Sequence, residues 1–173
     1  MKKTSVVLSL IFLGIGFGGV WISNPYIAAA YAKCVIAFVR DWVKQHPESK
    51  KHPFYILELG TGSGRFSFYV LKTLHEILKE LALDDVSICY VMSDFTKNNL
   101  NYYETHPALQ PYLEKGMLDF AVFNPLVDTT FDLMVSGEHL HCEQVKNPLI
   151  AIANYFFDSI PVDVFRVEHK TLN

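Results

Sequence analysis

The chain has 173 residues, of which 50% are apolar and 19% charged, a composition typical of one globular domain and unlike that of a disordered chain. Its formal net charge of -3 gives no reason to expect nucleic acid as a partner. The cysteines, Cys34, Cys89 and Cys142, have no paired spacing. They are predicted to be reduced thiols in a reducing compartment such as the cytoplasm.

The first segment of the chain is apolar. An uncharged run at 6–22 follows two lysines, and its length is close to the roughly 18 to 20 residues that cross a bilayer as a helix. We therefore expect residues 1–23 to form an N-terminal hydrophobic helix ahead of a domain at 24–173, with membrane association through residues 5–22. A secretory signal cleaved near the AYA at 30–32 and a buried or artefactual leader are the alternatives. The expected localisation is cytoplasmic, with this segment as a candidate membrane anchor.

Beyond this segment, the hydrophobic pattern alternates between strands and helices. Asn24-Pro25 marks the start of a helix. A second helix is predicted after the glycines of 60–64, where apolar residues have helical spacing as far as Leu81. A third helix is predicted to begin after Thr96, a candidate cap. Alternating strands and helices imply a parallel sheet covered by helices, whereas 125–148 is hard to interpret. Short apolar runs predict buried strands at 54–59, 86–92, 118–123 and 149–153.

A glycine turn follows the first predicted strand, in ILELGTGSGRF at 56–66. Glycine permits tight backbone geometry, and the start of the next helix offers N–H groups to a carboxylate or phosphate. The arrangement is therefore typical of ligand binding. The dinucleotide pattern requires a further glycine where this chain has Arg65. An NAD(P)-binding oxidoreductase domain is thus a disfavoured alternative function.

The stretch ELGTGSG at 58–64 resembles motif I of the class I S-adenosylmethionine-dependent methyltransferases. In that family the glycine turn lies against the methionine part of the cofactor. The resemblance therefore implies a Rossmann-like α/β sheet, S-adenosyl-L-methionine as the cofactor, and methyl transfer as the activity. It assigns these residues of the stretch to cofactor binding: Glu58, Gly60, Thr61, Gly62 and Gly64.

Two further cofactor positions are expected after the next strands. Asp94 could accept both ribose hydroxyls, because a strand end projects into the crevice beside the glycine turn; a turn aspartate or helix cap is the other interpretation. Phe95, which adjoins it, is also expected to contact the cofactor. After the third strand the family often has an aspartate that reaches the adenine amino group. Here Asn124 holds that place next to Phe123, and both are expected to contact the cofactor. An amide can also hydrogen-bond adenine, although Asn-Pro is ordinary turn chemistry as well.

The segment IANYFFDSIP at 152–161 is similar to a segment of the MidA family, which includes a mitochondrial arginine methyltransferase used in assembling respiratory complex I. Asn154, Asp158 and Pro161 match the family pattern, whereas Tyr155 replaces a glutamate that would pair with a guanidinium. We therefore expect Asn154, Tyr155 and Asp158 to be catalytic toward a protein or small-molecule nucleophile, with an arginine acceptor in doubt. Turn capping is the alternative role for Asn154 and Asp158.

The resemblance covers roughly residues 24–167, and the family's sheet has more strands than this chain supplies. The first four strands are predicted here, with 162–168 as a candidate fifth. An incomplete methyltransferase sheet is expected, because an open half-sheet would leave an apolar edge unpaired. A non-catalytic or truncated relic that binds the cofactor is therefore the first alternative function. EHLHCE at 138–143 lacks the second, distant ligand pair of a zinc site, so no metal is expected.

Overall fold

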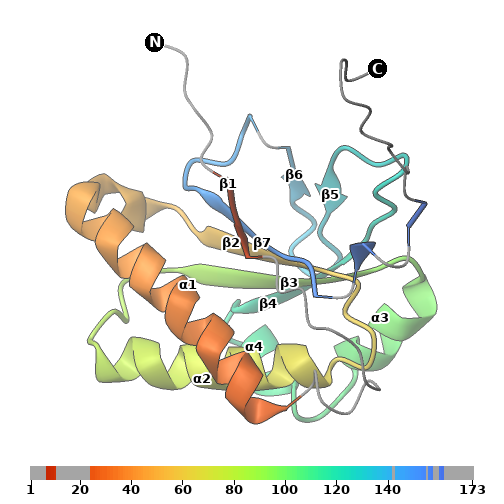
Figure 1. Cartoon of the computed structure of the whole chain (residues 1–173), viewed down its shortest axis with the longest axis horizontal. Coiled ribbons are helices and arrows are strands. Elements are labelled where there is room, and N and C mark those ends of the chain that lie inside the picture. Colours follow the sequence, from red (N-terminus) through yellow and green to blue (C-terminus); the bar gives the residue numbers. More distant parts are fainter. Residues whose placement is uncertain (1–6, 11–23, 142, 155, 158–159, 162–173) are drawn as a thin grey trace, which may run out of the picture.

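In the computed structural model, five parallel strands form one sheet, and two long helices lie across one of its faces (Figure 1). The structure describes residues 7–10, 24–141, 143–154, 156–157 and 160–161. The strand order in the sheet is β1-β7-β2-β3-β4. The bounds of these strands are β1 Val7–Leu10, β2 Phe54–Leu59, β3 Ile88–Asp94, β4 Leu118–Val122 and β7 Leu149–Ile152.

The helices begin where the sequence provides caps. The side chain of Asn24 accepts a hydrogen bond from the Ile27 N–H at 2.9 Å, and Pro25 occupies the first turn, where no N–H is needed. The helix that starts there packs against the next long helix, and the rings of Tyr31 and Phe66 meet edge to face with centroids 5.3 Å apart. The described helices are α1 Pro25–Gln45, the 3₁₀ turn η1 Pro47–Lys51, α2 Arg65–Glu80, α3 Lys97–Glu104 and α4 Gln110–Leu113.

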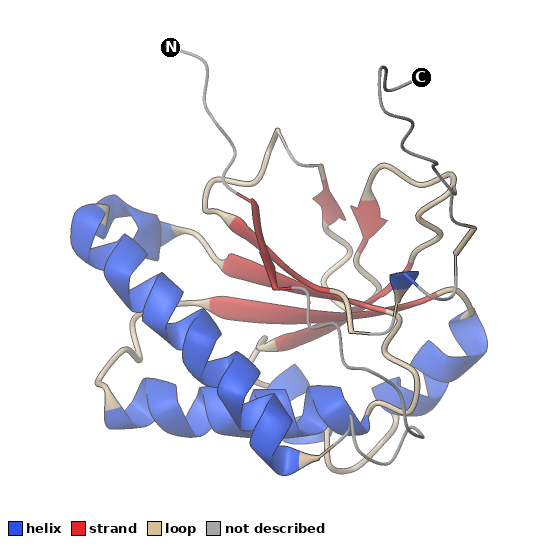
Figure 2. Cartoon of the chain, in the orientation of Figure 1, coloured by secondary structure: helices blue, strands red, loops and turns tan. Residues whose placement is uncertain are grey.

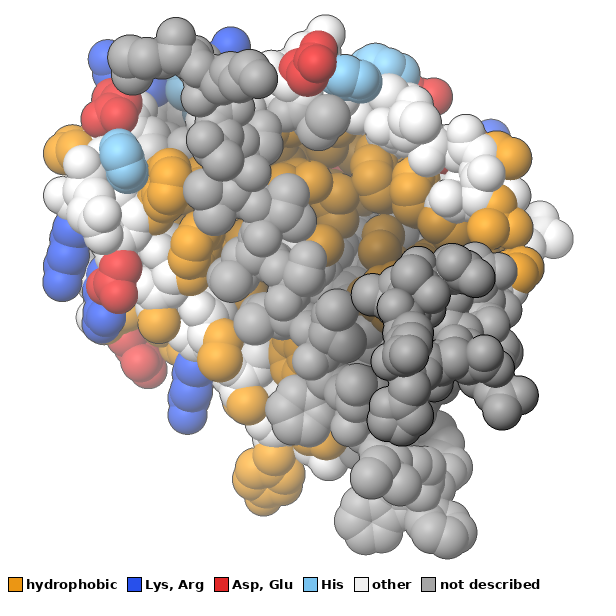
Figure 3. All heavy atoms as spheres, turned by 45° about the horizontal axis from the view of Figure 1, so that its top comes forward, with side chains coloured by type: hydrophobic (Ala, Val, Ile, Leu, Met, Phe, Trp, Pro, Cys, Tyr) orange, Lys and Arg blue, Asp and Glu red, His pale blue; other side chains and the backbone are white. Residues whose placement is uncertain are grey.

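Side-chain alternation along the strands creates two apolar clusters, one on each face of the sheet. In β2, Phe54 and Ile56 face the helices, whereas Tyr55 and Leu57 face the other way. A two-stranded hairpin, β5 Phe131–Asp132 and β6 His139–Leu140, packs on that second face (Figure 2). With the top of Figure 1 turned forward, hydrophobic side chains are gathered across the middle of the molecule (Figure 3).

Two buried polar side chains fasten this hairpin to the sheet. The carboxylate of Asp119 in β4 accepts hydrogen bonds from the N–H groups of Val135 at 2.8 Å and Ser136 at 3.0 Å. The hydroxyl of Tyr55 in β2 donates to the carboxylate of Glu138, and burial together with that carboxylate raises the pKa of Tyr55. The hairpin is therefore held by residues distant in sequence, which explains why 125–148 shows no local pattern.

The sequence located most of the sheet. The strand at 54–59 and the helix start at Pro25 are confirmed, and so is the parallel pairing of the strands. The second strand begins and ends two residues later than 86–92. Cys34 and Cys89 are free thiols. Cys142 and the candidate strand at 162–168 lie outside the described residues.

Part of the N-terminal apolar run belongs to the sheet. Residues 7–10 form β1, which pairs in parallel with β7 and brings Val7 opposite Leu149. The expected hydrophobic helix is therefore wrong for these residues, because the edge of β7 offers unpaired backbone groups to an extended apolar stretch. Residues 1–6 and 11–23 lie outside the described part of the chain. Of the helices that the structure describes, none is long and apolar enough to cross a membrane.

Candidate functional site

The order of the strands predicts where a ligand would bind. The chain runs from β2 to β3 and β4 in one direction and then returns to place β7 on the other side of β2. In open parallel sheets, ligands bind beyond the carboxyl ends of the strands at the point where the order reverses. That point is the end of β2, where the glycine turn begins.

The glycine turn has a backbone that other residues would strain. Gly60, Gly62 and Gly64 have φ values of 71°, 61° and 70°, in the left-handed region that glycine adopts without a steric penalty. The turn is fastened to the end of β3 by Thr61, whose N–H and hydroxyl donate to the Ser93 carbonyl oxygen at 2.9 and 3.1 Å. Gly64 is the N-cap of α2, so the N–H groups of the first helical turn lie next to it.

Aromatic rings pack against this turn from two sides. A Cβ atom added to Gly60 would lie 2.9 Å from Cδ2 of Phe156, and one added to Gly64 would lie 2.9 Å from Cε1 of Tyr103. The hydroxyl of Tyr103 donates to the carbonyl oxygen of Gly62. The first and third glycines are therefore required by close contacts as well as by backbone geometry.

Glu58 lies in β2, two residues before the first glycine of the turn. Strand alternation directs its side chain to the helix face of the sheet, where it is 3% exposed. Its carboxylate accepts hydrogen bonds from the hydroxyls of Ser67 in α2 and, at 2.9 Å, of Tyr90 in β3. Burial raises the pKa of Glu58 to about 7, although both hydroxyls act to lower it. The carboxylate therefore links α2 to the sheet.

Asp94 is the last residue of β3 and is 8% exposed. One of its carboxylate oxygens accepts from the Thr96 N–H at 3.1 Å, and the other accepts from the side-chain amide of Asn99 at 3.1 Å. The Thr96 hydroxyl also donates to the first of these oxygens, at 3.4 Å. These contacts match the turn interpretation of Asp94, whereas the N-cap of α3 is Thr96, which makes no side-chain capping bond. A carboxylate has about four lone-pair sites, so about one remains for a further donor at this strand end.

Asn124 and Phe123 follow β4. The side-chain oxygen of Asn124 accepts from the Leu126 N–H at 3.1 Å, and its own N–H donates to the Asp128 carboxylate at 2.7 Å. These hydrogen bonds match the turn interpretation of the Asn-Pro pair. The bond from the Leu126 N–H involves the same oxygen that an adenine amino group would need. The ring of Phe123 stacks on Phe131 of the hairpin, with centroids 4.0 Å apart.

The chain that leaves β7 brings an unexpected residue to the glycine turn. Asn154 is half-buried just beyond the strand, whereas Tyr155 and Asp158 lie outside the described residues. Phe156 is 4% exposed, touches Gly60 and stacks on Phe95, with centroids 5.6 Å apart and planes 6° apart. The available sequence signal for Phe156 was an aromatic pair placed directly after a strand that ends at the predicted crevice.

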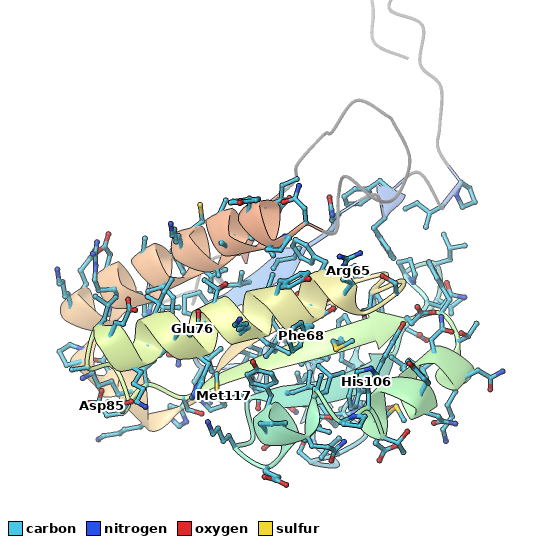
Figure 4. The ribbon with its side chains drawn as sticks, turned by 90° about the horizontal axis from the view of Figure 1, so that it is seen from below. Arg65, Phe68, Glu76, Asp85, His106 and Met117 are labelled. Carbon is cyan, nitrogen blue, oxygen red and sulfur yellow. The ribbon has the colours of Figure 1, made fainter. Side chains whose placement is uncertain are left out.

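A separate hollow of about 280 Å³ lies on the helix side of the turn. Figure 4 displays Arg65 and Phe68 on α2, with His106 beyond the end of α3. The guanidinium of Arg65 lies over the ring of Tyr69, 5.9 Å from its centroid. The predicted positions Asp94 and Asn124 do not line this hollow, whereas Gly64 of the glycine turn does. Its lining residues are Ser63, Gly64, Arg65, Phe68, Tyr102, Tyr103, His106, Ala108 and Leu109.

The histidines of EHLHCE lie in and beside the hairpin. His139 bonds to the carboxylate of Asp132 on the facing strand, and both side chains are largely exposed. Within the described ranges, no group of three or more histidine, cysteine, aspartate or glutamate side chains is arranged to hold a metal ion.

A glycine turn at the reversal point of a parallel α/β sheet, with a carboxylate at the end of the next strand, defines a Rossmann-like protein that binds a nucleoside cofactor. A family model described as "Putative S-adenosyl-L-methionine-dependent methyltransferase" matches residues 34–173, and the chain belongs to that family. Its class of enzyme is therefore the S-adenosyl-L-methionine-dependent methyltransferases, and S-adenosyl-L-methionine is the cofactor. Neither a curated protein nor a solved structure gives a significant match.

Proposed function

We propose that the crevice at the end of β2 binds S-adenosyl-L-methionine and that the chain methylates a nucleophile on a protein or small molecule. The observation that carries this proposal is the glycine turn at the reversal point of the sheet. Its three glycines have positive φ values, and no side chain projects from them into the crevice. The residues present therefore fit an elongated cofactor that approaches the backbone closely.

The two ends of the proposed site suit the two ends of this cofactor. The N–H groups of the first turn of α2 are suited to the carboxylate of the amino-acid part. The buried Asp94 at the next strand end is suited to the ribose hydroxyls, since about one lone-pair site remains and a second is freed when the 3.4 Å bond from the Thr96 hydroxyl is released. Phe95 is 40% exposed beside it and offers an apolar surface to the adenosine. The side-chain oxygen of Asn124 accepts from the Leu126 N–H and has a second lone pair that the adenine amino group could use.

The acceptor is proposed to approach over β7, on the side of β2 opposite Asp94. When bound, S-adenosyl-L-methionine supplies an electrophilic methyl group, so the protein must chiefly position the acceptor and keep a lone pair available. The half-buried Asn154 could accept a hydrogen bond from an acceptor N–H or O–H. Tyr155 and Asp158 are proposed to act with it, from the similarity of the segment alone.

The MidA-like relationship is a further part of this proposal. It rests on Asn154, Asp158 and Pro161 in IANYFFDSIP. Tyr155 in place of a glutamate removes the charge that would pair with a guanidinium, since a phenol is neutral at neutral pH. The substitution favours an acceptor that is uncharged over an arginine side chain.

Calorimetric titration of the whole chain with S-adenosylhomocysteine tests the cofactor site. We expect micromolar binding that weakens at least about tenfold in Asp94→Asn, because one charged acceptor of the ribose hydroxyls is lost. Asp85→Asn is the control, since Asp85 is an exposed carboxylate paired with Lys50 away from the crevice. A folded chain that does not bind S-adenosylhomocysteine but binds NADH would contradict the proposal and favour an oxidoreductase.

A further inference from the structure

The chain that leaves β7 passes across the carboxyl end of β2. In the sheet, β2 lies between β7 and β3. Phe156 follows β7, and Phe95 follows β3, yet their rings are stacked with centroids 5.6 Å apart. The side chain of Phe156 therefore spans the end of β2, which is where the glycine turn and the crevice begin.

The ring of Phe156 is buried by this position. It is 4% exposed, whereas its neighbour Phe157 is 44% exposed and Phe95 is 40% exposed. Its Cδ2 lies where a side chain of Gly60 would have to project, 2.9 Å from the added Cβ atom. The side of Gly60 from which a side chain would project is thus already covered by an aromatic ring.

This space overlaps with the proposed cofactor site. A ligand that lies against the glycine turn at one end and reaches Asp94 at the other must cross from the end of β2 to the end of β3. The stacked rings of Phe156 and Phe95 occupy the same line, because one touches Gly60 and the other adjoins Asp94.

We propose that the ring of Phe156 occupies the methionine end of the crevice when no cofactor is bound, and that the cofactor must displace it to reach Gly60. The inference rests on the proposed function. A protein whose binding-competent state is only a fraction of the population binds with an affinity reduced by that fraction. Phe156 therefore sets the apparent affinity for the cofactor without contributing a polar contact.

Phe156→Ala tests this inference with S-adenosylhomocysteine as the probe. We expect the dissociation constant to fall by about tenfold, because the site no longer has to be vacated. Tyr26→Ala is the control, since it removes an aromatic ring that is 87% exposed at the start of α1, whereas the ring of Phe157 packs edge to face on Phe156. Phe156→Leu, a smaller change, should tighten binding less and serves if the alanine variant is poorly folded.

A direct measurement of displacement uses one 4-fluorophenylalanine at position 156. Saturating S-adenosylhomocysteine should move the fluorine resonance at 156 toward its solvent-exposed value. Binding that is unchanged or weaker in Phe156→Ala, or a resonance at 156 that keeps its buried value on binding, would overturn the inference. If the wild-type chain and every variant fail to bind, the proposed function fails, and this inference fails with it.

Discussion

Gly60 has two separate reasons to be glycine, namely its φ of +71° and the ring of Phe156 against it. Gly116 has only the first reason, with a φ of +66° and nothing within 4 Å of an added Cβ atom. We expect Gly116→Ala to lower the free energy of unfolding by about 1 kcal/mol, from backbone strain alone. Gly60→Ala should lower it further, because the ring must also move. Urea denaturation of both variants measures the difference.

Gly60→Ala is expected to lose more unfolding free energy than Gly116→Ala. This difference should become smaller when Phe156 is also replaced by alanine, since the two changes act on one contact. Equal losses of unfolding free energy at Gly60 and Gly116 would mean that the ring of Phe156 moves away from Gly60 at no cost in stability. That result would argue against the proposal that this ring holds its position in the crevice.

Glu58 should make the stability of the fold depend on pH. Its pKa is raised from 4.5 to about 7 by burial, so between these values the folded state retains a proton that the unfolded state has lost. The free energy of unfolding should therefore fall as the pH rises from 4.5 to 7, by on the order of 3 kcal/mol. Below this window both states are protonated, and the contribution is fully present.

Glu58→Gln is the variant that isolates this effect, because its amide oxygen can still accept from Ser67 and Tyr90 but does not titrate. Urea denaturation at pH 5 and pH 8 should show a smaller difference in unfolding free energy for the variant than for the wild type. The same pH dependence in both proteins would assign the effect to other groups.

At the scale of elements, the hairpin on the second face depends on Asp119. Its buried carboxylate accepts from the N–H groups of Val135 and Ser136, so Asp119→Asn replaces one acceptor oxygen by a donor. We expect a loss of about 1–3 kcal/mol in unfolding free energy and faster hydrogen exchange at these two amides. Asp132→Asn changes an exposed carboxylate in the same hairpin and should alter stability little. Unaltered exchange in Asp119→Asn would contradict the anchoring role.

Some elements could be predicted because their signals are local. Pro53 and Gly60 bound the apolar run of β2, and Asn24 supplies its own cap to α1. The hairpin could not be predicted in this way, since its strands are two residues long and their anchors, Tyr55 and Asp119, lie in other strands.

The candidate site was predicted in part for the same reason. The glycine turn is a local pattern and was located, together with the strand end that carries Asp94. The motif grouped Glu58 with the glycines, but strand alternation directs its carboxylate to the helix side. Phe156 was missed because its contact with Gly60 depends on the order of the strands, which brings β7 beside β2.

At the scale of the whole molecule, β1 closes one edge of the sheet through its pairing with β7. In a chain that lacks residues 2–10, we expect faster hydrogen exchange for those β7 amides whose N–H groups point toward β1. The amides of β4, at the opposite end of the strand order, are the internal control and should keep their exchange rates. Unchanged exchange throughout β7 would show that β1 contributes nothing to that edge.

The pairing of Val7 with Leu149 also makes the order of synthesis matter for folding. At a ribosomal rate of about 5–20 residues per second, β1 leaves the ribosome on the order of ten seconds before its partner strand exists. Throughout that interval the apolar N-terminal stretch is open to chaperones and targeting factors that bind emerging hydrophobic segments. In a cell, residues 7–10 can therefore pair with β7 only after those factors have dissociated from them.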